Sequence, residues 1–436
     1  MYKSSLALAV TLGIFAQQAA AAGFVEDSKL SLSSRTMYFN DDNREGGADN
    51  RESGQGFKLD YLSGFTQGTV GFGVDVQALW GIHLDGGRGH HPDNSSFFPS
   101  ESNGSAVDQW SRIGGNAKAR FSKTEAHFGS ALAPALPILV SNDGRLLPQT
   151  FEGATIQSKE IDNLTINAGQ LTHAMGRASS NHTGLSVAGA TQDSNKFRYG
   201  GLDYKLTKDL TLQYYYSNLE DFYKQHFLGA THLFQIDKDQ SFKTDLRWFD
   251  SSSDGKNGQT GYIFNNNNGY AKNRGEVDNK TWSAIFTYTL GGNSFLLGHQ
   301  RVSDDGGFVW VGQGSLANEG AGGSSFYLFT DSMLNQFAKA GENTTFGQYA
   351  YDFPGLGVPG LKASVSYLKG EDGRNANGNG TFSEWERDAR IDYVIQQGPL
   401  KGLGTSLRQG VYRSGFSTAV DKDQTRLIFN YTYNFL

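Results

Sequence analysis

The sequence predicts an all-β protein, a transmembrane antiparallel β-barrel of about 18 strands whose third extracellular loop folds into the interior. The first evidence is the last eleven residues, Arg426 to Leu436, in which apolar or aromatic side chains occupy every second position from Leu427 to Phe435. Such alternation suits a membrane-spanning barrel strand, because one face meets lipid and the other meets water. The second observation is that similar segments recur along the chain, joined by connections that are alternately very short and long. Outer-membrane barrels place short turns in the periplasm and long loops outside.

Counting the alternating segments gives about 18 strands, and an even number returns the last strand to the side where the first begins. About sixteen strands is the main alternative, since the segments at 124–129 and 228–236 are the least regular. The predicted strands lie near 28–39, 56–65, 69–80, 110–121, 124–129, 151–159, 164–173, 196–206, 210–219, 228–236, 242–250, 281–290, 294–303, 343–353, 361–369, 384–396, 403–413 and 424–436.

The connections between these segments fall into two classes. The short ones carry Gly, Asp, Asn or Pro, as tight turns require, and include 206–210, 290–294, 353–361 and 397–403. The long ones are polar and rich in Gly and Asn, and lie at 41–55, 84–109, 178–195, 250–280, 303–343, 370–383 and 414–423.

The N-terminal segment, residues 1–22, has the pattern of a secretory signal peptide. Lys3 precedes an apolar stretch from Leu6 to Ala16, and the alanines from Ala19 to Ala22 offer small-residue cleavage sites. The predicted mature chain, residues 23–436, forms the barrel domain. A buried N-terminal helix is the alternative. No later segment approaches 18 uninterrupted apolar residues, which excludes a helical membrane protein.

Composition excludes several classes of partner. A chain without cysteine that is exported must be held together by strand pairing and burial rather than by disulfides. The formal net charge of -6 gives no basic footprint for nucleic acid. His83, His90 and His91 lie in a polar, Gly-rich segment that we expect to be solvated, so we expect no metal site and no cofactor.

The polar faces of the predicted strands indicate a water-filled interior. Between Phe242 and Phe249, one face carries Lys243, Asp245 and Arg247. A dry core does not tolerate charges at this density. A barrel of about 18 strands is wide enough to hold an aqueous channel instead.

The most distinctive segment is Ala131 to Phe151, which contains Pro134, Pro137 and Pro148 and is therefore not a regular central strand. It is nevertheless strongly apolar. We expect this third outer loop to fold back into the barrel, pack its apolar residues on the wall and present Asn142, Asp143 and Arg145 to the interior, which narrows the channel. The alternative is a surface loop packed on neighbouring loops.

Several motifs together resemble the OprD family of substrate-specific outer-membrane porins. They are N-D-G-R-L-L-P-Q-T-F-E-G (142–153), G-F-V-E-D-S-K-L (23–30), S-G-F-T-Q-G-T-V-G-F-G (63–73), G-V-P-G-L (357–361) and W-E-R-D (385–388). The resemblance runs through essentially the whole mature chain. It implies an 18-stranded barrel, a constriction made by the third loop with others, and a row of arginines and lysines that leads carboxylate-bearing nutrients through the pore.

Carried over residue by residue, the resemblance implies a basic ladder of Arg145, Arg177, Lys362, Arg390, Arg408 and Arg413. Strand alternation independently turns Lys362, Arg390 and Arg408 inward, and adds Lys118 and Arg120. Arg413 falls on the lipid-facing phase, so only a bulge or a position above the membrane brings it into the pore. Asp143, with Asp304 and Asp305 on the seventh loop, is the expected acidic counter-wall. The alternative role for any of these cations, above all Arg413 and Arg301, is neutralising lipopolysaccharide phosphates at the rim.

The sequence therefore predicts a porin of the bacterial outer membrane for passive, selective uptake of small carboxylates, and no enzyme. Arginine suits this task because its planar fork binds carboxylate through two parallel hydrogen bonds. A non-selective diffusion porin is the second hypothesis. An outer-membrane hydrolase is a distant third, which requires a Ser and a His within hydrogen-bond reach on the outer face. The expected partners are small carboxylate solutes, outer-membrane lipid and lipopolysaccharide, with the chain a monomer or a loose trimer.

Overall fold

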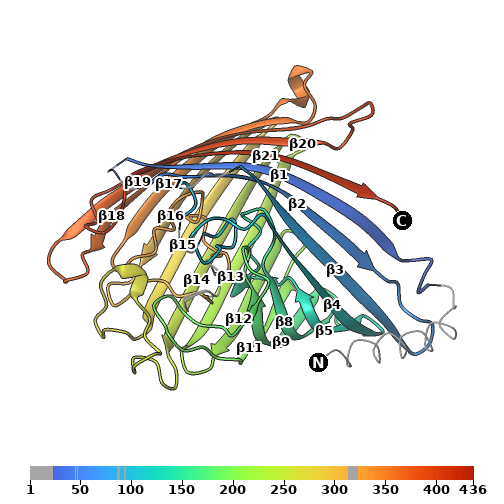
Figure 1. Ribbon diagram of the computed structural model, residues 1–436, viewed down its shortest axis with the longest axis horizontal. Coiled ribbons are helices and arrows are strands. Elements are labelled where there is room, and N and C mark those ends of the chain that lie inside the picture. Colours follow the sequence, from blue (N-terminus) through green and yellow to red (C-terminus); the bar gives the residue numbers. More distant parts are fainter. Residues whose placement is uncertain (1–22, 45, 47, 86–88, 93–94, 313–322) are drawn as a thin grey trace.

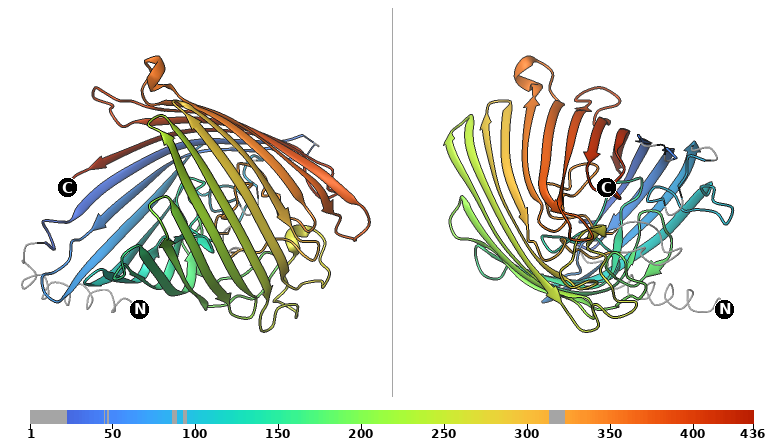
Figure 2. Two further views of the ribbon diagram at one scale, coloured as in Figure 1. Left: turned by 180° about the vertical axis from the view of Figure 1, so that it is seen from behind. Right: turned by 90° about the vertical axis from the view of Figure 1, so that its left-hand side faces the viewer.

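The computed structural model describes residues 23–44, 46, 48–85, 89–92, 95–312 and 323–436. The predicted signal peptide lies outside the described residues. The strands form one antiparallel sheet that closes on itself around a central space (Figures 1 and 2). Closure comes from β1 (Lys29–Asn43) and β21 (Lys422–Asn434), which pair from Ser31 opposite Asn434 to Asn43 opposite Lys422. Because every long strand pairs on both sides, the barrel has no open edge.

Eighteen of the strands are nine residues or longer, which confirms the predicted barrel. Between β1 and β21 these are β2 (Asn50–Leu62), β3 (Val70–Asp85), β4 (Gln109–Phe121), β5 (Thr124–Leu132), β8 (Thr150–Ser158), β9 (Leu164–Met175), β11 (Phe197–Lys205), β12 (Leu210–Leu219), β13 (Tyr223–Asp237), β14 (Gln240–Ser253), β15 (Asp278–Leu290), β16 (Asn293–Val302), β17 (Asn343–Asp352), β18 (Leu361–Arg374), β19 (Thr381–Val394) and β20 (Gly404–Ser414). The short elements are β6 (Ala135–Leu136), β7 (Leu139–Val140), β10 (His182–Thr183) and the 3-10 turns η1 (Asn266–Asn268) and η2 (Phe353–Leu356). Among the described residues, no helix is long and apolar enough to cross a membrane.

The two faces of the strands differ as the sequence pattern requires. Along β18, Val365 and Tyr367 are 54% and 48% exposed, whereas Ser366 and Leu368, which alternate with them, are buried. The exposed apolar face is the outside of the barrel, where lipid replaces water. The opposite face lines the interior.

Each predicted segment overlaps one of the long strands, and the largest boundary errors have a physical cause. β13 begins at Tyr223, five residues before the predicted start, because Tyr223 and Phe227 face the interior while Lys224 faces outward. This segment therefore has apolar side chains on the inner face and a charged one on the outer face, the opposite of the usual pattern of a barrel strand. The connection from β12 to β13 is therefore only 220–222, with Asp221 in the left-handed region (φ 69°). β2 likewise begins at Asn50 rather than 56.

At the end of the barrel toward the left of Figure 1, the connections 44–49, 375–380 and 415–421 are no longer than turns such as 353–360 at the other end. The long loops predicted at 41–55, 370–383 and 414–423 are therefore shorter than expected, because strand pairing continues into the predicted loops. The longest connections, at 86–108, 133–149, 176–196, 254–277 and 303–342, also lie at this end. Four of them are named here: loop 2 (86–108), loop 3 (133–149), loop 4 (176–196) and loop 7 (303–342). Loop 3 contains a short hairpin despite its three prolines. Its strands β6 and β7 pair on either side of a turn that contains Pro137.

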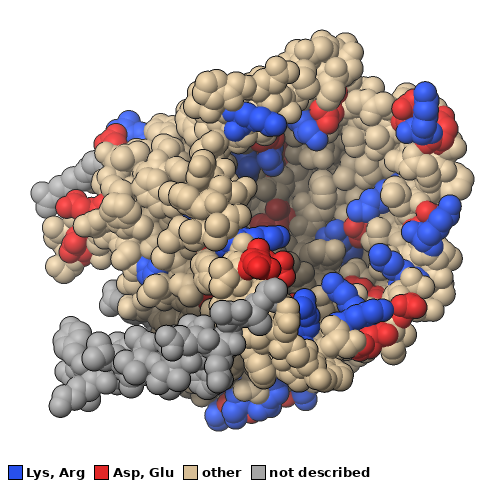
Figure 3. Space-filling model, turned by 90° about the vertical axis from the view of Figure 1, so that its right-hand side faces the viewer, with Lys and Arg blue, Asp and Glu red and all other residues tan. Residues whose placement is uncertain are grey.

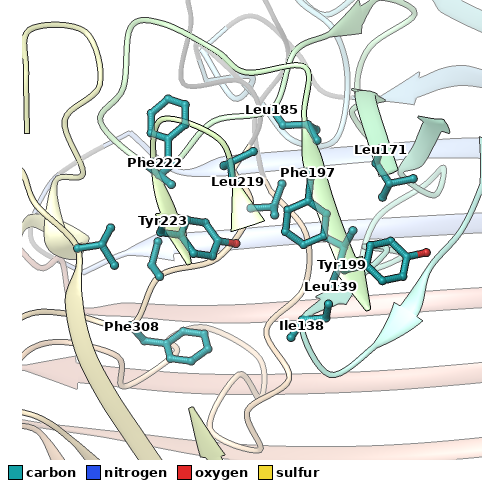
Figure 4. Close-up of a cluster of buried hydrophobic side chains, with 14 of the residues drawn as sticks. Ile138, Leu139, Leu171, Leu185, Phe197, Tyr199, Leu219, Phe222, Tyr223 and Phe308 are labelled. Atoms are coloured by element: carbon teal, nitrogen blue, oxygen red, sulfur yellow. The ribbon is translucent and has the colours of Figure 1, made fainter. Parts of the chain in front are cut away.

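Apolar side chains from several loops share one buried cluster with the wall (Figure 4). Ile138 and Leu139 of loop 3, Leu185 of loop 4 and Phe308 of loop 7 pack with strand residues including Phe197 of β11. Burying one such side chain contributes about 1.5–3 kcal/mol. A second cluster joins Phe97 and Phe98 of loop 2 and Leu146 and Leu147 of loop 3 to Met37 and Phe39 of β1. Much of the wall beneath the loops is therefore dry, which the sequence pattern of a watery lumen did not predict.

Candidate functional site

Three arginines stand directly opposite one another on neighbouring strands of the inner wall. Arg390 on β19 pairs with Arg408 on β20, and Arg408 pairs with Arg426 on β21. Ile391 is exposed on the outer face, so alternation turns Arg390 inward. Arg35 on β1 is close enough to Arg408 for their charges to repel. These four residues are called the arginine row.

Arg35 links the row to loop 3. Its guanidinium forms a two-pronged ion pair with Asp143, with Nη1 to Oδ1 at 2.8 Å and Nη2 to Oδ2 at 3.0 Å. Nη1 also donates to the carbonyl of Arg145 at 2.6 Å. The expected acidic residue Asp143 thus holds an arginine that the sequence analysis did not single out. Alternation alone did not show that Arg35 faces the interior, because its neighbours on β1, such as Leu32 and Ser34, are mixed in polarity.

Two loop arginines lie beside the row. Arg145 Nε donates to Ser96 Oγ at 3.1 Å and its guanidinium lies 4.8 Å from the ring centre of Phe39. Arg177 Nη1 donates to Asn142 Oδ1 at 3.2 Å. Burial, and next the charge of Arg177, lower the pKa of Arg145 to about 9, and burial lowers the pKa of Arg177 to about 10. Both stay protonated near pH 7, so the site concentrates positive charge with little water to screen it.

Arg112 ties the two loops together. This buried side chain on β4 donates through Nη1 to the carbonyls of Gly176 and Ser179, the latter at 2.9 Å, and through Nη2 to that of Pro148. The carbonyls of Gly176 and Ser179 lie on either side of Arg177 in loop 4, and the carbonyl of Pro148 lies near the end of loop 3. The next residue on β4, Ile113, is 70% exposed on the outer face. Because side chains alternate along a strand, Arg112 faces the interior, and so do Lys118 and Arg120.

A stripe of acids on the inner face of β19 holds loop 7 next to the row. The carboxylate of Glu386 accepts backbone N–H groups from Met333, Leu334 and Asn335, at 3.0, 3.0 and 2.8 Å. On either side of Glu386 along the strand, Asp388 accepts from Ser332 and Glu384 accepts from the Asn335 amide. Arg426 Nη2 completes the arrangement by donating to the Met333 carbonyl at 2.8 Å.

This docking places Asp331 in the positive field. Its carboxylate accepts from the backbone N–H of Phe326 at 3.3 Å and interacts electrostatically with Arg145, Arg177 and Arg426. Burial outweighs these favourable terms and raises the pKa of Asp331 to about 6. Asp331, rather than Asp304 or Asp305, is thus the loop 7 acid that faces the arginines.

The other predicted residues lie elsewhere. Asp304 pairs with Arg301 at 3.1 Å and Asp305 pairs with Lys272 at 3.4 Å, both on the exposed surface of the long-connection end. Arg413 lies on the outer phase of β20 and pairs with Asp423 at 2.8 Å. The structure therefore does not bring these three residues to the cluster.

Three predicted cations lie on the inner face toward the short-turn end. Lys118 is buried against Asp75, with Nζ to Oδ1 at 2.6 Å. Arg120 stacks over Phe65 at 4.3 Å. Lys362 pairs with Asp352 at 2.9 Å and stands opposite Asp392.

Two cavities flank loop 3. One of about 490 Å³ is lined by Arg35, Lys58 and Asp143 with Pro134, Ser141, Pro148 and Gln149. The other, of about 420 Å³, is lined by Glu125, His127, Asn167 and Tyr199 with residues 131–136. Each is large enough for a small organic molecule. Figure 3 shows the hollow of the barrel, with basic and acidic side chains along its rim and walls.

Loop 2 contains a buried histidine rather than the solvated one that the sequence suggested. His91 Nδ1 lies 2.5 Å from Glu52 Oε1, and Nε2 lies 2.8 Å from the hydroxyl of Ser100. Glu52 also accepts from Ser95 at 3.0 Å. In the part of the chain that the structure describes, no three His, Asp or Glu side chains are placed to hold a metal ion.

Comparison with known proteins places this architecture. Residues 22–435 match the family described as outer membrane porin, OprD family. The chain belongs to the OprD family. It is 33% identical to Porin D of Pseudomonas aeruginosa, with 99% of both chains covered, and 33% identical to Porin-like protein GalP of Pseudomonas putida, with 99% of this chain and 97% of that one covered.

The solved structure of Pseudomonas aeruginosa OccK8 (OprE) is 47% identical and superposes with a TM-score of 0.86, covering 95% of this chain and all of that one. The chain is accordingly a porin of the outer membrane, as its sequence indicated.

Proposed function

We propose that this OprD-family porin passes small carboxylates passively and selectively, with the arginine row as its selective element. The supporting observation is that Arg390, Arg408 and Arg426 stand in register on three adjacent strands of the inner wall. The exposed guanidinium of Arg390 and the half-buried one of Arg408 each offer a planar fork that matches a carboxylate, and arginine keeps its charge at every physiological pH. Arg426 is buried and donates to Gln424 and to the Met333 carbonyl, so it contributes its charge rather than a free fork. Several moderate sites in series admit an anion without trapping it.

Loop 3 is proposed to narrow the channel at this level. Arg35 holds Asp143, Arg112 holds the Pro148 carbonyl, and Leu146 and Leu147 pack on inner-face residues of β1. Loop 7 supplies the facing side through Asp331. The ladder then continues past the row to Lys118, Arg120 and Lys362, while Arg413 has no proposed role in it.

A relative adds chemical support. Pseudomonas aeruginosa OpdK, 34% identical with a TM-score of 0.83 over 95% of this chain, has been solved with vanillate. Vanillate is an aromatic carboxylate, the solute class that a row of guanidinium groups selects. We therefore include aromatic acids among the candidate solutes.

Uptake into liposomes that contain the purified protein tests the proposal. Each carboxylate is paired with its uncharged amide of nearly the same size, for example benzoate with benzamide. We expect the carboxylate to enter about tenfold faster, the effect of one charge-assisted hydrogen bond of about 1.4 kcal/mol. Equal rates within every pair would instead identify a general diffusion porin.

A serine hydrolase is a second candidate, and the contacts of His91 favour it. Ser100 is exposed, and the hydroxyl, the imidazole and the Glu52 carboxylate stand in the order of a nucleophile, a base and an orienting acid. A fluorophosphonate probe should then modify Ser100, but not nearby Ser105, and Ser100→Ala should abolish labelling. If Ser100 stays unmodified, the network only fixes loop 2 on β2.

A further inference from the structure

The outer wall of β16–β19 carries a groove that combines an apolar floor with cations. The groove has a volume of about 570 Å³ and is lined by outward-facing residues that include Leu297, Gly347, Tyr349, Val365, Lys369 and Arg387. Two other outer-face hollows, over β1–β4 and over β3–β9, have no outward-facing Lys or Arg among the residues that the structure describes. The groove over β16–β19 therefore differs from them in charge.

Strand register orders the groove into rows. Arg387, Tyr367, Gly347 and Leu297 stand opposite one another across the four strands. The next row toward the long connections is Trp385, Lys369, Thr345 and His299. The next row toward the short turns is Ala389, Val365, Tyr349 and Phe295. Polarity thus changes along the groove, from apolar and aromatic to basic.

Gly347 makes the hollow. A side chain there would meet only the Leu296 carbonyl, at 3.5 Å from its first carbon, so the space above this glycine is open. Tyr349 and Tyr367 stand at its sides, exposed on the lipid-facing wall. An acyl chain suits such a hollow, because it gains dispersion contacts with the side chains that line it.

Arg387 needs an anion. It is exposed on the outer face, and within the described part of the chain it makes no hydrogen bond or ion pair. An unpaired charge on the lipid-facing side of a strand lowers the stability of the barrel, and the loss grows with its depth in the membrane. Lys369, one row further out, pairs with Glu371 at 2.5 Å, and both side chains are at least half exposed. Such an exposed pair contributes little and leaves the lysine available to a stronger anion.

We propose that this groove binds a phosphorylated, acylated glycolipid of the outer leaflet, the class to which lipopolysaccharide belongs. Arg387 and Lys369 bind its phosphate, and one acyl chain lies over Gly347 between the two tyrosines. The row that contains Arg387 stands at the middle of the four strands, and the row of Lys369 and Trp385 lies on its long-connection side. That end faces outward in outer-membrane barrels, so an outer-leaflet lipid reaches the groove from the side of Lys369. Trp385, stacked 6.0 Å from Tyr367, marks the level of the head groups.

Native mass spectrometry of the full barrel in detergent tests the site, with diphosphorylated lipid A as the probe. The double variant Arg387→Gln/Lys369→Gln should lower lipid A affinity at least about tenfold, as loss of charge-assisted hydrogen bonds implies. Removing both phosphates from lipid A should weaken binding to the wild-type protein by a similar factor. Gly347→Leu should lower the affinity for both forms of the lipid, because it fills the hollow.

Lys280→Gln is the matched control, since Lys280 is an exposed, outward-facing lysine on β15 outside the groove. It should leave lipid A binding unchanged. Equal binding by the double variant and the wild type would overturn the proposal, as would an equal loss in Lys280→Gln. Phosphatidylglycerol that binds as tightly as lipid A would also overturn it, because the groove would then accept any anionic lipid. Unboiled gel migration shows that each variant retains the closed barrel.

Discussion

The two halves of the inner wall hold the loops in different ways. Around β9–β13, loops 3, 4 and 7 are fixed by a dry apolar cluster that includes Phe197 and Tyr223. Around β19–β21 and β1, loop 3 also packs Leu146 and Leu147 on β1, but carboxylates and guanidinium groups such as Glu386 and Arg35 add ionic contacts to loops 3 and 7. Apolar contacts respond weakly to salt and pH, whereas ionic contacts respond to both. We therefore expect the first half to hold its loops equally well at any salt concentration, and the contacts of the second half to weaken as salt rises.

The largest effect should come from the apolar half. Phe197→Ala removes a fully buried ring from the cluster and should lower the free energy of unfolding in detergent by about 3–5 kcal/mol. The loss should be the same at low and high salt. Phe286→Ala is the control, because that ring is 42% exposed on the outer face. A loss that shrinks as salt rises would show that charges, not packing, hold this half.

The next effect should come from the acid that docks loop 7. Glu386→Gln replaces one of the two oxygens that accept three backbone N–H groups with an amide that cannot accept. Hydrogen exchange of the amides of residues 333–335 should accelerate about tenfold to a hundredfold, which corresponds to about 1.4–2.8 kcal/mol. Glu371→Gln on the outer face of β18 should leave these amides unchanged. Unaltered exchange in Glu386→Gln would mean that the apolar half alone positions loop 7.

Smaller changes should follow from the arginine row, and they concern permeation rather than folding. Arg390→Ala and Arg408→Ala each remove a fork and a charge, while the Lys variants keep the charge. Carboxylate uptake should slow by up to about tenfold in the Ala variants and less in the Lys variants, and the difference should shrink at high salt. Uncharged sugars should pass unchanged or faster. Equal responses of carboxylates and sugars would show that the row does not select.

The strands were predictable because a lipid-facing wall enforces a period of two residues over long stretches. Prediction failed where loops cover the wall. Tyr223 and Phe227 face the interior because the apolar cluster is there, so the outward Lys224 hid the start of β13. The alternation shows which face of the strand a residue occupies, but it does not show whether that face contacts water, lipid or a loop.

The site divides along the same line. Arg390 and Arg408 followed from motif and alternation, but their alignment with Arg426 depends on strand register, which turn geometry sets. Asp331 carries no local signal, because its position depends on a distant acid, Glu386, that binds the next residues of loop 7. Asp304 and Asp305 were equally plausible in sequence, yet they lie in exposed ion pairs.

The smallest effect should be a pH dependence of the ionic half. The pKa of Asp331 is raised to about 6, so this carboxylate is charged at pH 7 and neutral at pH 5. Acidification across that window therefore adds one positive charge to the field of Arg145, Arg177 and Arg426, which remain protonated throughout. Because an acid with a raised pKa binds its proton more tightly in the folded state, the fold gains stability as pH falls from about 6 toward about 4.

Anion preference, measured as the reversal potential in a KCl gradient, should rise from pH 7 to pH 5 with a midpoint near 6. One unit charge in a wet pore contributes only about 1 kcal/mol or less, so the shift should be modest and should fade at high salt. Asp331→Asn should hold the pore at its low-pH selectivity and remove the midpoint. Asp304→Asn, which alters an exposed acid of the same loop, should retain it. A midpoint that survives in Asp331→Asn would assign the titration to another acid near the row, such as Asp388.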